Sequence, residues 1–279
     1  SGYLPKLVRE GYRGPIYCSG ATKDLCEILL RDSAYISERD AERANRYRYT
    51  KHEPAKPLYT VADAEAAIAQ LVPVAFHTDI ALDIGARVYM RRAGHILGAS
   101  TLEVKWGGKT IVFSGDLGRY DDPFMFDPEP VRKADYVVIE STYGDRTHPK
   151  TDPMEQLGEV IGRTVSRGGT VVIPAFAVGR AQLLLYHIWM LKKAGRFANV
   201  AIYLDSPMAI NATELLCAHL DDHRFTPDVC METCNIASYA RDVEASKAIT
   251  SDRMPKVVIA ASGMMTGGRV LHHVEAFGG

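Results

Sequence analysis

The chain has 279 residues, of which 47% are hydrophobic, and this is enough for a large core in one big domain or two medium ones. Lys and Arg total 33 and Asp and Glu total 34, for a net charge of -1, which argues against a uniformly basic surface that coats nucleic acid. No apolar run approaches the roughly 20 residues that span a bilayer, and no signal peptide opens the chain, so we expect a cytoplasmic protein without a membrane partner.

The five cysteines form no C-x-x-C pair. Cys230 and Cys234 lie four residues apart and downstream of His223, which leaves a zinc knuckle open as one interpretation. No second tight pair of ligands follows them. Reduced cysteines in a cytoplasmic protein are therefore the favoured interpretation.

The first part of the chain mixes helices with a strand-rich stretch. Helices are predicted around residues 24–31 and 62–71, and alternating apolar residues predict a strand over 100–106 that turns at Gly107-Gly108. Further strands are predicted over residues 86–92, 110–114 and 134–140. The continuous apolar run from Tyr136 to Ile139 is typical of a strand that is covered on both faces.

After about Thr147 strands and helices alternate, which implies a parallel sheet with right-handed crossovers. Apolar residues at helical spacing predict a helix that begins near Met154 and ends before Gly168-Gly169. The predicted strands are 170–174, 200–204 and 256–261, and the predicted helices are 180–194, 209–220 and 268–276. We place a boundary in the polar loop 145–152, which gives domains 1–147 and 148–279.

Three polar side chains follow apolar strands of the first part. His95 lies in a Gly-flanked loop, Asp116 follows the second strand of the hairpin, and Glu140 ends the next strand. The carboxyl ends of neighbouring strands share one edge in layered α/β folds, so a histidine and two acids could converge there. The plain alternative is a loop histidine, an aspartate that forms a turn, and a glutamate that caps a helix or pairs with an arginine.

Six strings, in the correct order, resemble motifs of the β-CASP nucleases, an RNA-processing branch of the metallo-β-lactamase fold that includes the endonuclease subunit of the mRNA 3′-end cleavage machinery. They are GHILGAS (94–100), FSGDLG (113–118), IESTYGDR (139–146), PAFAVGRAQ (174–182), DSPMA (205–209) and SGMMTGGR (262–269). The resemblance covers essentially the whole chain. It implies an α/β fold in which an incomplete metallo-β-lactamase αββα lobe carries an inserted β-CASP α/β domain with a mainly parallel sheet.

The resemblance also implies roles for the three polar residues. His95 matches a ligand of one zinc ion, and Asp116 matches a catalytic carboxylate that bridges two zinc ions. Glu140 matches an acid that lies beside the metals and orients a catalytic histidine. The implied reaction is hydrolysis of RNA phosphodiester bonds by water that the two zinc ions activate. A cleft over the metals would admit single-stranded RNA more readily than a duplex, and homodimers are common among such relatives.

Two family motifs have no match in this chain. The His-x-His-x-Asp-His cluster of the family precedes a Ser-Gly-Tyr-Leu-Pro stretch, which here occupies residues 1–5, and the nine histidines match neither C-terminal histidine motif. We therefore expect this chain alone to bind zinc poorly and to be inactive. The alternatives to a ribonuclease are a metal-free scaffold subunit of an RNA-processing complex and a small-molecule metallo-hydrolase.

Candidate phosphate-binding residues lie in the second part. Arg180 and Arg269 each open a predicted helix after a glycine, where free N–H groups and the guanidinium fork favour phosphate, and Ser262 is a third candidate. The alternative is that the two arginines pair with Asp205 or Glu275. Basic and aromatic residues also alternate over 43–51, which suits stacking of single-stranded RNA but is more typical of a solvated helix face.

Overall fold

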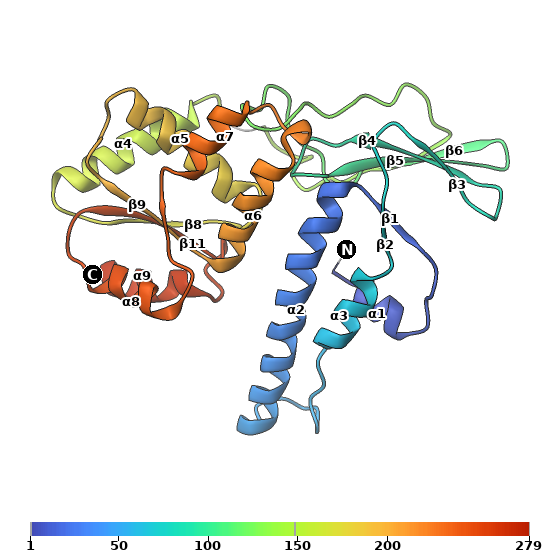
Figure 1. The fold of residues 1–279 in the computed structure, drawn as a ribbon, viewed down its shortest axis with the longest axis horizontal. Coiled ribbons are helices and arrows are strands. Elements are labelled where there is room, and N and C mark those ends of the chain that lie inside the picture. The colour runs from blue at the N-terminus through green and yellow to red at the C-terminus, as the bar shows by residue number, and fades with distance from the viewer. Residues whose placement is uncertain (1, 148, 279) are drawn as a thin grey trace. The chain divides into compact units, whose positions relative to one another are not determined.

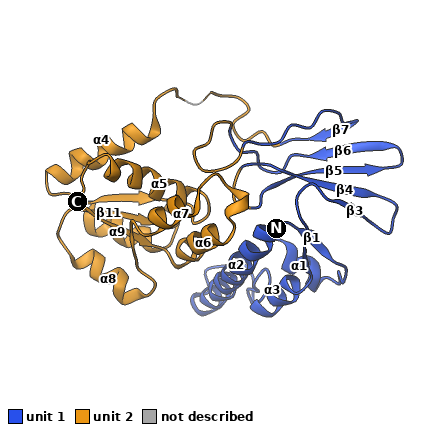
Figure 2. Ribbon diagram, turned by 45° about the horizontal axis from the view of Figure 1, so that its top comes forward, with its two compact units in different colours: residues 1–94, 98–119, 127–139 blue, residues 95–97, 120–126, 140–279 orange. Residues whose placement is uncertain are grey.

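The computed structural model describes residues 2–147 and 149–278, and the chain divides into two compact units (Figure 2). Unit 1 comprises residues 1–94, 98–119 and 127–139, and unit 2 comprises residues 95–97, 120–126 and 140–279. Both units combine helices and strands, so the predicted α/β class is confirmed. The predicted domains, 1–147 and 148–279, stay a prediction. The compact units assign residues 95–97, 120–126 and 140–147 to unit 2.

The N-terminal part of unit 1 is mostly helical. It contains α1 (Leu4–Arg9), α2 (Gly20–Tyr47) and α3 (Val61–Ile68), together with β1 (Ile16–Cys18) and β2 (Leu71–Pro73), which pair in parallel. The helix predicted over 62–71 ends earlier because Leu71 begins β2. A compact apolar core joins these elements and contains Cys18, Cys26, Leu30, Ala34, Tyr59, Ala64, Ile68 and Leu71.

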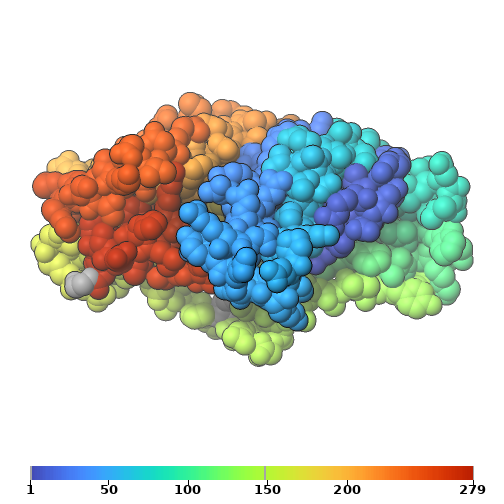
Figure 3. Space-filling view, turned by 90° about the horizontal axis from the view of Figure 1, so that it is seen from below, coloured from blue at the N-terminus to red at the C-terminus, as the bar shows by residue number. Residues whose placement is uncertain are grey.

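Helix α2 is much longer than the helix predicted over 24–31. The Ser19 side chain caps its first turn by accepting a hydrogen bond from Thr22 N, and neither Gly nor Pro interrupts the sequence after Gly20 until Pro54. Its second half buries few side chains, so apolar periodicity could not reveal it. Figure 3 shows the region around the C-terminal end of α2, in lighter blue, on the surface. Tyr47, the last residue of α2, and Tyr49, just after it, are both exposed. The segment 43–51 is therefore accessible, as either of its two interpretations requires.

The rest of unit 1 is a five-stranded sheet in the order β3-β4-β5-β6-β7. Its strands are β3 (Asp79–Ala81), β4 (Arg87–Arg92), β5 (Ser100–Trp106), β6 (Lys109–Phe113) and β7 (Tyr136–Val138). The first four pair antiparallel, and β7 pairs parallel to β6. The predicted two-residue hairpin turn is confirmed. Gly107 and Gly108 both have positive φ values (55° and 75°), as a type I′ turn requires.

The prediction that the run from Tyr136 to Ile139 is covered on both faces is wrong. All four residues of the run are more than half exposed, and β7 pairs with β6 at the edge of the sheet. An apolar run indicates a strand, but elements far along the chain decide whether anything covers it. Here no described element covers either face of β7.

Unit 2 contains a four-stranded parallel sheet in the order β10-β9-β11-β8, which confirms the predicted mainly parallel sheet. The strands are β8 (Val171–Pro174), β9 (Ala201–Asp205), β10 (Ser238–Tyr239) and β11 (Lys256–Ala260). The helices are α4 (Pro153–Ser166), α5 (Arg180–Lys193), α6 (Pro207–Ala218), α7 (Pro227–Cys234), α8 (Val243–Ser251) and α9 (Arg269–Phe277), with a 3₁₀ turn at Leu220–Asp222. Figure 1 shows α4 and α5 on one side of this sheet and α8 and α9 on the other.

The central strand β11 has both faces buried. Val257 and Ile259 belong to the core formed with α4, α5 and α6, whereas Val258 and Ala260 belong to the core formed with α8 and α9. Successive side chains of a strand point to opposite faces, so one strand serves both cores. The carboxyl ends of β8, β9 and β11 therefore lie along one edge of a rigid, doubly covered sheet, where the candidate residues of unit 2 are found.

Candidate functional site

The loop that carries His95 is anchored on its C-terminal side. The hydroxyls of Ser19 and Thr22, at the start of α2, both donate hydrogen bonds to the Gly98 carbonyl oxygen (2.9 and 3.0 Å). Gly98 has a φ of 76°, and a Cβ atom there would lie 2.6 Å from Ser19 Oγ. Only glycine fits this position, so the chain leaves the His95 loop along a fixed path. The His95 side chain itself is exposed.

The loop that carries Asp116 is held by unit 1 on both sides of this residue. Ser114 N donates to Val138 O (2.9 Å), and Gly118 N donates to Ala93 O (2.8 Å). Gly115 has a φ of 59°, and a Cβ atom there would lie 2.8 Å from Ser100 O. These contacts position an exposed carboxylate on a short rigid loop after β6. They also tie this loop to Ala93, which precedes His95 by two residues.

Within unit 2, the segment that includes His95 contacts the start of α5. Gly179, the N-cap of α5, has a φ of 79°, and a Cβ atom there would lie 2.9 Å from Ile96 Cγ2. Ile96 follows His95, and Arg180 follows Gly179. His95, the candidate metal ligand, and Arg180, the candidate phosphate-binding residue, are thus each adjacent in sequence to one of the two residues that form this tight contact.

The side chains of Arg180 and Arg269 have different environments. Arg180 is exposed, and among the described residues its guanidinium forms no hydrogen bond or ion pair. Arg269, by contrast, donates through Nη1 to Asp205 Oδ1 (2.6 Å) and to Ala240 O (2.9 Å), and through Nη2 to Arg241 O (3.2 Å). This is the pairing with Asp205 that the sequence left open as the alternative to phosphate binding.

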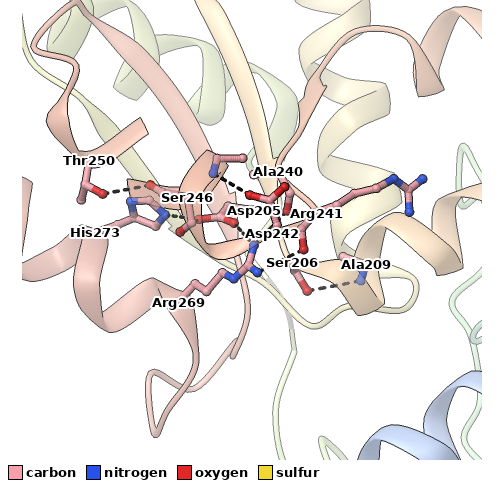
Figure 4. A network of polar contacts seen from close by, with 11 residues as sticks. Asp205, Ser206, Ala209, Ala240, Arg241, Asp242, Ser246, Thr250, Arg269 and His273 are labelled. Carbon is pink, nitrogen blue, oxygen red and sulfur yellow. Dashed lines mark hydrogen bonds and ion pairs between the residues drawn. The ribbon is translucent and has the colours of Figure 1, made fainter. Parts of the chain in front are cut away.

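Asp205 is the centre of the buried polar network drawn in Figure 4. Besides Arg269, it accepts a hydrogen bond from Ser246 Oγ (2.5 Å), and His273 Nε2 lies 2.6 Å from Oδ2. Burial raises the pKa of Asp205, but the hydrogen bonds from His273, Ser246 and Arg269 outweigh burial and hold its pKa below the ordinary value. The carboxylate therefore stays charged and joins β9 to α8 and α9.

Ser262 lies in the loop between β11 and α9. Its Oγ donates to Gly267 O (3.3 Å), and a Cβ atom on the next residue, Gly263, would lie 2.8 Å from Phe176 N. The loop after β11 is therefore in close contact with the loop after β8, which leads to Arg180. This places the Ser262 and Arg180 loops at the same edge of the parallel sheet.

Residues 181–279 match the Beta-Casp domain. The chain is 34% identical to "Ribonuclease TTHA0252" of Thermus thermophilus, over 98% of this chain and 61% of that protein. It is 32% identical to "Transcription termination factor FttA" of Methanosarcina mazei, over 99% of this chain and 43% of that protein. It is 26% identical to "RNase J-like protein" of Methanocaldococcus jannaschii, over 93% of this chain and 58% of that protein.

The chain belongs to the β-CASP family. The resemblance that the six sequence strings indicated is thereby confirmed. This β-CASP chain spans between about two fifths and three fifths of the length of these relatives.

The predicted roles of His95, Asp116, Glu140, Arg180, Ser262 and Arg269 in this β-CASP chain stay predictions. His95 and Glu140 belong to unit 2 and Asp116 belongs to unit 1. His95, Asp116 and Arg180 are exposed, whereas Glu140, Ser262 and Arg269 are partly buried. Among the residues that the structure describes, no helix has both the length and the apolar character that a membrane crossing needs.

The structure also reveals a cluster that sequence reasoning missed. The Sγ atoms of Cys217, Cys230 and Cys234 lie within 4.8 Å of one another in unit 2, and they form the one such group of three metal-ligating residue types found among residues 2–147 and 149–278. The i, i+4 spacing of Cys230 and Cys234 was the visible signal. Cys217 comes from another helix, α6, so no short motif could indicate it.

Proposed function

We propose that the complete protein that contains this chain is a metal-dependent ribonuclease that cleaves phosphodiester bonds of single-stranded RNA. Two relatives, the Thermus thermophilus and Methanocaldococcus jannaschii proteins, are named as a ribonuclease and an RNase J-like protein. In this proposal His95 and Asp116 bind zinc, Glu140 lies beside the metals and Arg180 binds a phosphate of the RNA. Homodimer formation and a cytoplasmic location remain predictions alongside it.

The donor chemistry of the two proposed ligands fits zinc. A neutral imidazole offers one nitrogen lone pair, and a carboxylate has two oxygens that can face two ions. Both side chains are exposed, and within the described part of the chain neither forms a hydrogen bond or ion pair, so their donor atoms are available. When bound, two zinc ions supply a hydroxide-like nucleophile near neutral pH and offset charge on the phosphate.

The contact of Ile96 with Gly179 is the observation that carries the proposal. It fixes the segment of His95 against the N-terminus of α5 within unit 2, next to an arginine whose guanidinium has no partner among the described residues. The first N–H groups of a helix and a planar guanidinium both favour a phosphate oxygen. Arg180 is therefore the better phosphate ligand of the two arginines, since Arg269 is occupied by Asp205 and two backbone carbonyls.

Substitution of Asp116 tests this function in the complete protein. Asp116→Asn removes the charge that would hold two cations, so we expect the rate of single-stranded RNA cleavage to fall by at least about 100-fold, the scale of losing one charge-stabilising group. Cleavage of end-labelled RNA and the zinc content per chain are the measurements. Asp83→Asn, in the exposed turn between β3 and β4, is the matched control and should leave both unchanged.

The two alternatives predict different results from the same assays. Unchanged turnover in Asp116→Asn would refute the role of this carboxylate. A wild-type protein that hydrolyses a thioester or a lactam but not RNA would be a small-molecule metallo-hydrolase. A wild-type protein that holds no metal and hydrolyses nothing would be a scaffold subunit.

A further inference from the structure

Three cysteine sulfurs converge where α6 meets α7. Cys217 lies in the last turn of α6, and Cys230 and Cys234 lie one turn apart on the same face of α7. The Sγ atom of Cys217 is 2.6 Å from that of Cys230 and 3.2 Å from that of Cys234. All three lie in unit 2, whereas the other two cysteines of the chain, Cys18 and Cys26, lie in unit 1.

Apolar side chains surround the three sulfurs. Cys230 is fully buried in a core with Phe124, Met125, Leu216 and Phe225, while Cys217 and Cys234 lie at its margin and are partly exposed. Cys230 is thus buried, whereas Cys217 and Cys234 are partly exposed to solvent. Free cysteines can pack as small apolar residues, but three sulfurs gathered at one point are also the donor set of a metal site.

We propose that Cys217, Cys230 and Cys234 bind one thiophilic divalent cation of the zinc class through three thiolates, with the fourth position open to water. Zinc–sulfur bonds of about 2.3 Å place the sulfurs of a tetrahedral site about 3.8 Å apart. The sulfurs here already lie within 4.8 Å of one another, so the site needs side-chain rotation that moves the Cys217 sulfur about 1 Å from that of Cys230 and about 0.6 Å from that of Cys234. Soft thiolate ligands select zinc and related soft ions over calcium and magnesium.

Two side chains that could fill the fourth ligand position, Glu214 and His223, already have other partners. Glu214 lies one turn before Cys217 on α6, but its carboxylate is engaged by Arg241 in an ion pair. His223 is close in sequence, but its Nε2 lies 2.9 Å from Leu216 O and its Nδ1 accepts from Phe225 N, so both ring nitrogens are used. The zinc knuckle that the sequence left open therefore lacks the histidine and gains Cys217 in its place.

The proposed site would join α7 to α6. Helix α7 has eight residues, and short helices depend on tertiary contacts for their stability. A cation that binds both helices would stabilise this corner of unit 2 without taking part in RNA cleavage. The site is thus independent of the proposed function and of the His95 and Asp116 ligands.

Cadmium is the probe for this site, because thiolate ligands give a ligand-to-metal charge-transfer band in the ultraviolet that nitrogen and oxygen ligands do not give. In the reduced complete protein we expect this band to rise and saturate at one Cd²⁺ per chain. Cys217→Ser, Cys230→Ser and Cys234→Ser should each weaken binding by at least about 10-fold, the scale of losing ligand support at a metal site. Cys26→Ser, which also replaces a buried cysteine, should leave the titration unchanged.

Two further measurements distinguish the thiolate site from the proposed catalytic metal site and from a disulfide. Asp116→Asn should keep the band, so the loss of the proposed catalytic metals does not affect the result. On the wild-type protein, bound Cd²⁺ should protect Cys217 and Cys234 from alkylation by iodoacetamide, as read by peptide mass spectrometry. Absence of the band, a band that survives all three substitutions, or a Cys217–Cys230 disulfide in the reduced protein would overturn the proposal.

Discussion

Strands β11 and β7 carry similar apolar runs but have opposite environments. Val258 at the centre of β11 is fully buried, whereas Val137 at the centre of β7 is 59% exposed. β11 lies between β9 and β8 and has helices on both faces, and β7 lies at the edge of its sheet. The position of a strand in its sheet therefore decides how buried the strand is, because the apolar runs of the two strands are similar.

The same contrast applies to the aspartates beside these sheets. Asp205 ends β9, is fully buried and accepts hydrogen bonds from three side chains. Asp135, just before β7, is exposed and accepts from Lys109 Nζ (3.0 Å) and Thr110 N (2.8 Å). Both carboxyl groups have a pKa below the ordinary value, but hydrogen bonds to Asp135 act in solvent, where they are screened.

Of the predicted effects, replacement of the two aspartates should give the largest difference in stability between unit 2 and unit 1. Asp205→Asn leaves the Arg269 guanidinium partly buried without its counter-charge, so we expect unit 2 to lose about 3–5 kcal/mol of unfolding free energy. Asp135→Asn should change the stability of unit 1 little, because water replaces the lost interactions. Hydrogen exchange by mass spectrometry on peptides from β9 and β6 measures each unit separately.

Equal exchange in the two variants would contradict this ranking. It would mean that the Asp205 network adds no more stability than a surface ion pair. A second variant, Arg269→Met, removes the other charge and should also destabilise unit 2, because it leaves Asp205 buried with one ionic partner fewer.

A pair of isoleucines tests the apolar side of the comparison. Ile259 in β11 is fully buried, and Ile139, directly after β7, is 64% exposed. Ile259→Ala should cost unit 2 about 2–5 kcal/mol, since it removes buried methyl groups and leaves a cavity. Ile139→Ala should cost less than about 0.5 kcal/mol in this chain, as exposed positions do. A large loss from Ile139→Ala in the complete protein would show that another element covers β7 there.

The regular elements of unit 2 could be predicted from the sequence because each strand–helix pair has its own local pattern. α5 starts and ends within one residue of its prediction, since a glycine precedes it and apolar residues continue to Leu191. The length of α2 and the exposure of β7 could not be predicted in this way. The second half of α2 buries few residues, and the environment of β7 depends on elements distant in sequence.

The sequence can propose candidate site residues where a short string carries them, as with Asp116 and Arg180, whose roles stay predictions. The partners that come from other elements could not be predicted in this way. Asp205 contacts Ser246 and His273 from α8 and α9, at sequence separations of 41 and 68 residues. Cys217 joins the thiol cluster from α6 in the same way. Such groups come together only because the parallel sheet aligns its crossover helices, a property of the whole unit rather than of any segment.

The pH dependence of the stability of unit 2 is the smallest and most specific of the expected effects. The folded-state pKa of Asp205 lies below its ordinary value of 3.8, so its contribution to stability is fully present above pH 3.8 and is lost as pH falls through the folded pKa. We expect urea unfolding, followed by the fluorescence of the buried Trp189 in α5, to show a stability difference between wild type and Asp205→Asn that shrinks in acid. The loss is smaller than that from substitution at neutral pH, because a protonated carboxyl group keeps some of its hydrogen bonds. A difference that stays constant from about pH 7 down to well below pH 3.8 would mean that shape, rather than the charge of Asp205, stabilises the covered sheet.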